Sequence, residues 1–186
     1  MSNCSACGLP KSDPQDKCSY CGIAVNGAGQ YVIAQSGTLY TLSAGGVVVG
    51  EAVPKEEVFQ LRRPGRLSSE NYLVPVEGTF QSCAAILNKA LDSIAQINFE
   101  ERYLDGASFA AYIDTKDRNT RLVLRKDGDH GVHIINPHGD IVLLASIDSE
   151  RPELSIDLLV VRPESELQPF GYFGIMVAVA QVAWHS

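Results

Sequence analysis

Apolar and polar residues alternate along most of the chain after residue 30. Three short runs, at residues 31–35, 38–42 and 47–49, are predicted to be strands, because Ser-Gly and Gly-Gly pairs between them are typical of turns. Six further runs with the same period follow: INFEERYL, ASFAAYI, TRLVLR, GVHII, DIVLLASI and LSIDLLVV. Short polar connections such as DTKDRN and NPHG join them, so we expect antiparallel neighbours.

Two segments depart from this alternation and are predicted to be helical. In FQSCAAILNKALDSIAQIN, Cys83, Leu87 and Leu91 recur at helical spacing, which predicts one main helix at about residues 81–96. PKEEVFQLRR is predicted to form one or two helical turns, because its Pro54 is favourable as a first helical residue.

The last apolar segment, FGIMVAVAQVAW, has no polar face. It is therefore either a strand buried on both sides or a helix packed into a groove, and its valines favour the strand. The pattern as a whole predicts an α+β fold, in which residues 31–186 form a mainly antiparallel sheet with the main helix against one face.

Four of the five cysteines form two C-x2-C pairs ten residues apart, Cys4, Cys7, Cys18 and Cys21. Four thiolates satisfy a tetrahedral Zn²⁺ with no open position, so we expect one structural zinc ion that does no chemistry. Iron fits the same four-sulfur site, and two disulfides are the alternative in a secreted chain.

This segment resembles the short bacterial and archaeal zinc-ribbon family, whose pattern is two C-x2-C-G knuckles about ten residues apart. The match covers residues 4–22 and includes all four cysteines and both following glycines. Ser5 and Ser19 depart from it, since that family often has Pro there. The resemblance implies a zinc ribbon at residues 1–23, which a linker at 24–30 joins to the sheet domain.

The net charge of −7 argues against broad electrostatic attachment to nucleic acid or to an anionic membrane. The N-terminus lacks a basic segment followed by an apolar run, so no signal peptide is predicted. Unpaired C-x2-C motifs without such a signal favour a reducing compartment, and we expect a cytoplasmic protein. The longest apolar run, from Phe170 to Trp184, is shorter than the roughly 20 residues that span a membrane.

Three groups of residues are candidates for chemistry beyond the zinc site. His130, His133 and Asp140 would give a hydrolase-like enzyme site if they converged, but residues three apart on a strand face opposite ways. Cys83, near the start of the predicted helix, is either a nucleophile or a small buried hydrophobe. Nucleic-acid binding through the ribbon and the basic cluster is the third hypothesis; the cluster comprises Arg62, Arg63 and Arg66.

The sealed metal site, the lack of convergent catalytic groups and the apolar C-terminal segment predict a non-enzymatic, zinc-binding adaptor. It would be a structural subunit of a bacterial or phage multiprotein assembly, or a homo-oligomer, and would act through protein–protein contacts. An exposed strand edge is one predicted contact, unless the segment from Phe170 to Trp184 completes the chain's own core. Aromatic anchors are the other, namely Tyr20, Tyr172, Phe173 and Trp184.

Overall fold

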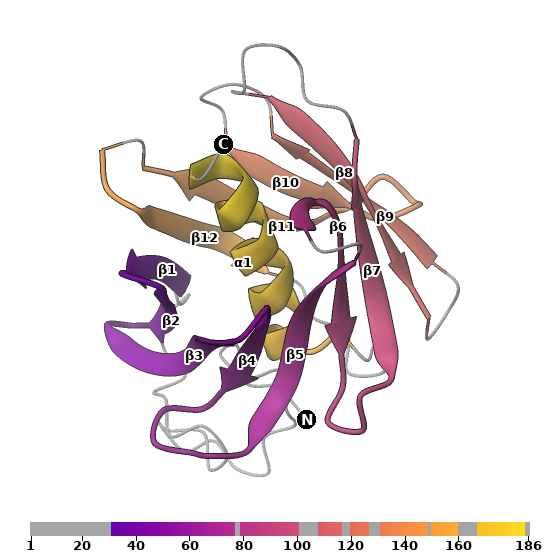
Figure 1. Ribbon diagram of the computed structural model, residues 1–186. Helices are drawn as coiled ribbons and strands as arrows, with labels where there is room; N and C mark the ends of the chain where they lie inside the picture. Colours follow the sequence, from indigo (N-terminus) through magenta and orange to yellow (C-terminus); the bar gives the residue numbers. More distant parts are fainter. Residues whose placement is uncertain are drawn as a thin grey trace, which may run out of the picture.

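The computed structural model describes residues 31–76, 79–100, 108–116, 120–126, 131–148, 150–159 and 167–184. In this part of the chain, twelve antiparallel strands close into a barrel around one helix, α1 (Figure 1). The elements are β1 Tyr31–Ser36, β2 Leu39–Ala44, β3 Val47–Lys55, β4 Val58–Arg62, β5 Ser69–Val76, β6 Thr79–Leu87, β7 Ser93–Phe99, β8 Phe109–Thr115, β9 Thr120–Lys126, β10 Val132–Ile135, β11 Ile141–Ile147, β12 Glu153–Leu159 and α1 Pro169–Trp184.

Each strand pairs with the next along the chain, and the barrel closes where β1 pairs with β12. In that closing register Tyr31 lies opposite Ile156 and Ile33 lies opposite Leu154. All four of these side chains are buried. Closure gives every described strand a partner on both sides, so the barrel presents no free strand edge.

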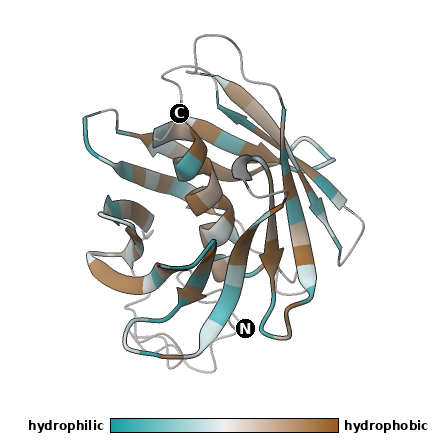
Figure 2. Cartoon of the chain, viewed as in Figure 1, coloured by the Kyte–Doolittle hydropathy of each residue, from teal (hydrophilic) through white to brown (hydrophobic). Residues whose placement is uncertain are grey.

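The alternation along each strand divides an apolar inner face from a more polar outer face. On β8, for example, Phe109, Ala111 and Ile113 are buried inside, whereas Tyr112 is only half-buried. Hydropathy colouring shows the same alternation around the wall, with a mostly brown helix at the centre (Figure 2). The inner faces of all the strands therefore contribute to one core.

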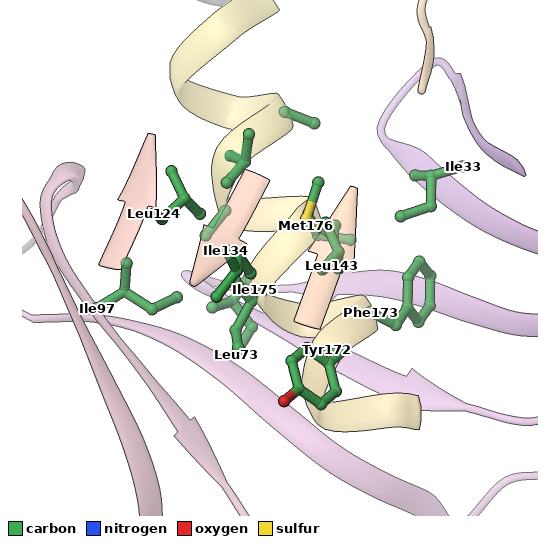
Figure 3. Packing of buried hydrophobic residues seen from close by; sticks show 14 of the residues in the cluster. Ile33, Leu73, Ile97, Leu124, Ile134, Leu143, Tyr172, Phe173, Ile175 and Met176 are labelled. Carbon is green, nitrogen blue, oxygen red and sulfur yellow. The ribbon is translucent and has the colours of Figure 1, made fainter. Parts of the chain in front are cut away.

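The helix α1 fills the middle of the barrel. Twelve of its sixteen residues are buried, and they lie on all sides of the helix. In Figure 3, Ile134 and Leu143 from the wall lie around Ile175 and Met176 of the helix. A helix enclosed on every side has no polar face, which explains why FGIMVAVAQVAW shows no helical periodicity. Within the described residues, no helix is long and apolar enough to cross a membrane.

The expected α+β fold, with an N-terminal zinc ribbon and a sheet covered by a helix on one face, is wrong. The described chain is a largely all-β closed barrel, whose helix lies inside and comes last in the sequence. The boundaries predicted at residues 1–23 and 24–30 lie outside the described residues.

The main helix predicted at residues 81–96 is also wrong, because this region forms β6, a turn and β7. Ala84 and Ile86 face the core, but the outward-facing Cys83 and Ala85 are small and buried as well. With apolar residues on both faces, period two disappears and the spacing resembles that of a helix. Leu91 was assigned to the apolar stripe but lies in the turn, with φ of 67° and 61% exposure.

Two further expectations need correction. PKEEVFQLRR forms the β3–β4 hairpin, whose turn places Glu56 at a φ of 57°, and not helical turns. The C-terminal segment is a helix, although its valines favoured a strand. Burial inside the barrel outweighs the few tenths of a kcal/mol by which valine disfavours a helix.

Candidate functional site

The depression described between the barrel wall and the start of α1 is too small to hold a substrate. The depression between the wall and the start of the helix, lined by Tyr31, Ile156 and Tyr172 among others, has a cavity volume of about 0 Å³. The wall and α1 together make a continuous buried cluster. Side chains that could bind another molecule lie on the outer face of the wall.

The outward side chains of strands β8 to β11 form a mixed apolar and cationic surface. We call this surface the outer patch, and it consists of Tyr112, Val123, Arg125, His133, Ile135, Ile141 and Leu144. On β9 the alternation that creates it is complete, since Leu122 and Leu124 are buried inside while Arg125 is exposed.

The strand register arranges the outer patch in two rows. In the first row Tyr112 lies opposite Val123, Val123 opposite Ile135, and Ile135 opposite Ile141. The second row runs parallel to it and consists of Arg125, His133 and Leu144. Residues directly opposite each other have Cβ atoms about 5 Å apart, so the side chains of each row are close enough to form a continuous surface.

The apolar part of the outer patch is partly exposed to solvent. Ile141 is 44% exposed and Leu144 is 38% exposed, and both lie on β11. Val123 and Ile135 beside them are half-buried. Isolated exposed aliphatic residues need no explanation, but Ile141 lies opposite Ile135 in register, and contiguous apolar side chains are typical of contact surfaces.

Arg125 differs from the other arginines on the strands. Arg121 forms two hydrogen bonds to Asp114, of 2.7 and 3.1 Å, and lies over the ring of Tyr112. The hydrogen bond and the charge of Asp114 raise the pKa of Arg121 further. Arg62 likewise contacts Glu51, at 3.3 Å.

Arg125 is exposed and, among the described residues, has no acidic partner. Its direct neighbours across the sheet are Ala110 on β8 and His133 on β10. Neither side chain carries a negative charge, so neither can form a salt bridge with Arg125. The strand register therefore explains why this guanidinium has no carboxylate beside it on the described strands.

A polar network borders the outer patch on β6 and β7, and it contains Cys83. The Cys83 thiol donates to Asn98 Oδ1 at 3.2 Å and accepts from Gln96 Nε2 at 3.1 Å. Asn98 Nδ2 in turn donates a hydrogen bond to Asp114 Oδ2 at 3.5 Å. Because Cys83 lies on a strand, the argument that a helix start activates it as a nucleophile no longer applies.

The structure does not bring His133 and Asp140 together. His133 lies within β10, whereas Asp140 lies opposite Asn136 in the turn that follows. Asn136 is three residues beyond His133, which at 3.3 Å per residue places Asp140 roughly 10 Å from His133 along the strand. The carboxylate of Asp140 accepts a hydrogen bond from Asn136 within the turn. His130 lies outside the described residues, so the enzyme hypothesis stays an untested prediction.

The basic cluster of the nucleic-acid hypothesis is largely neutralised by carboxylates. Arg62 pairs with Glu51, and Arg63 pairs with Glu70, both at 3.3 Å. Arg66 is exposed in the turn before β5. Paired guanidinium groups attract phosphate weakly, so these contacts give the hypothesis little support.

The predicted zinc ligands Cys4, Cys7, Cys18 and Cys21 lie outside the described residues. In the described part of the chain, no group of three or more His, Cys, Asp or Glu side chains could hold a metal. The description of the fold as a metal-binding zinc ribbon is therefore unsupported and is corrected to a β-barrel. Zinc binding by the four cysteines stays an untested prediction.

The aromatic residues suggested as interface anchors have other roles where they are described. Tyr172 and Phe173 are buried inside the barrel. Trp184, at the end of α1, is half-buried and stacks on Tyr40 with ring centroids 6.1 Å apart. Tyr20 lies outside the described residues. The apolar C-terminal segment thus completes the protein's own core, as one of the two sequence interpretations proposed.

Sequence reasoning missed most of the outer patch and named only His133. The signal was present in TRLVLRK, where alternation places Arg121, Val123 and Arg125 on one face. It could not show which strands lie on either side, and so could not identify the adjacent row of apolar residues.

Comparisons with known proteins leave the chain without an assigned family. No family model matches it, and no curated protein matches it. An X-ray structure of an Arabidopsis thaliana protein is similar over 82% of this chain and 89% of that chain, with 9% sequence identity and a TM-score of 0.33. A likeness at that level carries no conclusion about this chain.

Proposed function

We propose that this protein is a non-enzymatic adaptor or structural subunit of a cytoplasmic multiprotein assembly, and that the outer patch is its contact surface. The observation that carries the proposal is the row of Val123, Ile135 and Ile141 beside Arg125, which has no acidic partner among the described residues. Apolar residues with an arginine beside them are the composition typical of the centre of protein interfaces.

Two arguments that the sequence suggested for this function no longer support it. The apolar C-terminal segment is enclosed in the barrel, and no described strand has a free edge for a partner strand. The proposal therefore rests on side-chain contacts with the face of the sheet. Such a face is rigid, because every strand beneath it is hydrogen-bonded on both sides, and a rigid surface loses little entropy on binding.

The proposal is tested by affinity purification of the tagged full-length chain from its source organism, with quantitative mass spectrometry. The variant is Ile141→Ser/Leu144→Ser, and the matched control is Val47→Ser/Val48→Ser, because those valines on β3 are at least as exposed, at 59% and 41%. Exposed apolar side chains contribute little to stability, so both variants are expected to unfold at nearly the wild-type temperature.

A defined set of proteins should co-purify with the wild type and with the control, and should be depleted about fivefold or more with the patch variant. Recovery of the same set in the same amounts with the patch variant would refute the proposal. So would a wild-type chain that co-purifies with nothing and sediments as a monomer.

A further inference from the structure

We infer that the outer patch binds an acidic segment of a partner protein, in which a carboxylate pairs with Arg125 and an aliphatic side chain covers Val123 and Ile135. This inference rests on the proposed function and specifies the chemistry of the partner. Charge complementarity supports it, because the patch presents one arginine that nothing in the described chain neutralises.

The strand arginines provide an internal comparison. Three arginines lie within described strands, and two of them, Arg62 and Arg121, contact a carboxylate of the neighbouring strand. Arg125 has no such neighbour, although a carboxylate at position 110 or 133 would face it directly. Guanidinium groups bind carboxylates in a bidentate manner, and Arg125 offers that geometry to an incoming group.

The spacing within the outer patch indicates how the partner must be built. Arg125 and Val123 lie two residues apart on the same face of β9, which corresponds to roughly 6.6 Å. In an extended peptide, residues i and i+2 share a face and have the same separation. An Asp or Glu separated by one residue from Ile, Leu or Val therefore places both groups correctly.

Other classes of ligand fit this surface less well. Phosphate backbones and anionic membranes require several basic groups to be competitive. Here a single arginine that has no acidic partner among the described residues lies next to branched aliphatic side chains, on a protein with a net charge of −7. Strand addition is excluded along the described barrel, because its edges are all paired. Side-chain recognition of an acidic and apolar peptide is what remains.

The test uses the full-length chain and three synthetic peptides of about twelve residues, with binding measured by fluorescence anisotropy. The first peptide repeats the pattern Asp-Ser-Ile-Ser, the second has Lys in place of Asp, and the third has Ala in place of Ile. We expect the first peptide to bind at least about tenfold more tightly than either of the others, because each of those lacks one of the two complementary groups.

The chain variants identify where the peptide binds. Arg125→Ala should weaken binding of the Asp-Ser-Ile-Ser peptide about tenfold or more, as expected on loss of a charged hydrogen bond. Arg66→Ala is the matched control, since Arg66 is also exposed but lies between β4 and β5, away from β9. The affinity of the Arg66→Ala variant for the Asp-Ser-Ile-Ser peptide should stay within about twofold of that of the wild type.

Several outcomes would overturn the inference while leaving the proposed function standing. These are undetectable binding of the Asp-Ser-Ile-Ser peptide at about millimolar concentration, equal binding of the Lys peptide, and no effect of Arg125→Ala. Vesicles of phosphatidylcholine and phosphatidylserine provide a further arm. Vesicle binding by the wild type that Arg125→Ala abolishes would instead identify a membrane surface as the ligand. The proposed function fails separately, in the purification with the Ile141→Ser/Leu144→Ser variant.

Discussion

Gly131 immediately precedes β10 and Gly139 lies in the turn between β10 and β11, so together they allow a controlled test of the hairpin that carries the outer patch. Both have a left-handed backbone, with φ of 86° and 88°. An added Cβ at Gly139 would have no atom within 4 Å, whereas at Gly131 it would overlap the carbonyl oxygen of Ala145 on β11. Alanine substitution at Gly139 thus measures the backbone strain, and at Gly131 the same strain plus a steric clash.

The expected magnitudes follow from these two terms. A left-handed backbone costs alanine about 1–2 kcal/mol, and we expect Gly139→Ala to lower the free energy of unfolding by that amount. The clash at Gly131 involves a backbone atom, which cannot rotate away, so β10 must move away from β11. Such overpacking adds about 1–3 kcal/mol. The entropy lost from the unfolded chain is the same for both substitutions and cancels in their difference.

Thermal and urea unfolding followed by circular dichroism would measure both changes. For a domain of this size, each kcal/mol corresponds to about 2–4 °C in Tm, so Gly131→Ala should melt about 4–20 °C below the wild type. Gly139→Ala should melt about 2–8 °C below it. If the free energies of unfolding of the two variants agree within about 0.5 kcal/mol, β11 does not approach β10 as described, and the register beneath the outer patch is wrong.

Three further predictions follow from the core and from the cysteines. Burial raises the pKa of Tyr40 to about 12, although a hydrogen bond from Gln181 opposes the shift. The unfolded chain therefore loses this proton at lower pH than the folded chain. The contribution of Tyr40 to stability is fully present below pH 10, and the free energy of unfolding should fall by up to about 2–3 kcal/mol by pH 12. Urea unfolding at pH 9 and 11 should show a smaller fall in the free energy of unfolding for Tyr40→Phe than for the wild type, and equal falls would contradict the shift. A chain ending at Gln168 lacks α1 and should bind the dye ANS without a cooperative thermal transition, because the barrel loses its central packing; a sharp transition would count against this. Elemental analysis should find one zinc per wild-type chain and none in Cys4→Ser/Cys7→Ser, whereas zinc retained by that variant would rule out the four-cysteine site.

The strands of the barrel were the most predictable part of the fold, and its closure was the least. TRLVLRK, with Leu122 and Leu124 inside and charged residues outside, forms β9 as its alternation predicts. Alternation, however, shows which face of a strand is buried and not which strand lies beside it. The pairing of Tyr31 with Ile156 joins the first and the last described strands, and no local pattern indicates it.

The helix predicted at residues 81–96 and the preference for a strand at the C-terminus were wrong for one physical reason, which is burial on all sides. Cys83 and Ala85 are covered although they face outward, so β6 lost its period of two and resembled a helix. The helix α1 is enclosed by the barrel, so it lost its period of 3.6 and resembled a strand. Hydrophobic periodicity reports the difference between an exposed and a buried face, and it disappears when both faces are covered.

The same reasoning explains why the outer patch could be only partly predicted. That Val123 and Arg125 face outward follows from β9 alone. That Arg125 is unpaired depends on residues of two other strands, since Ala110 and His133 are the side chains beside it. A one-residue shift of β10 against β9 would turn His133 inward and break both rows of the outer patch. The pairing between β9 and β10 therefore links the fold to the proposed recognition of acidic segments.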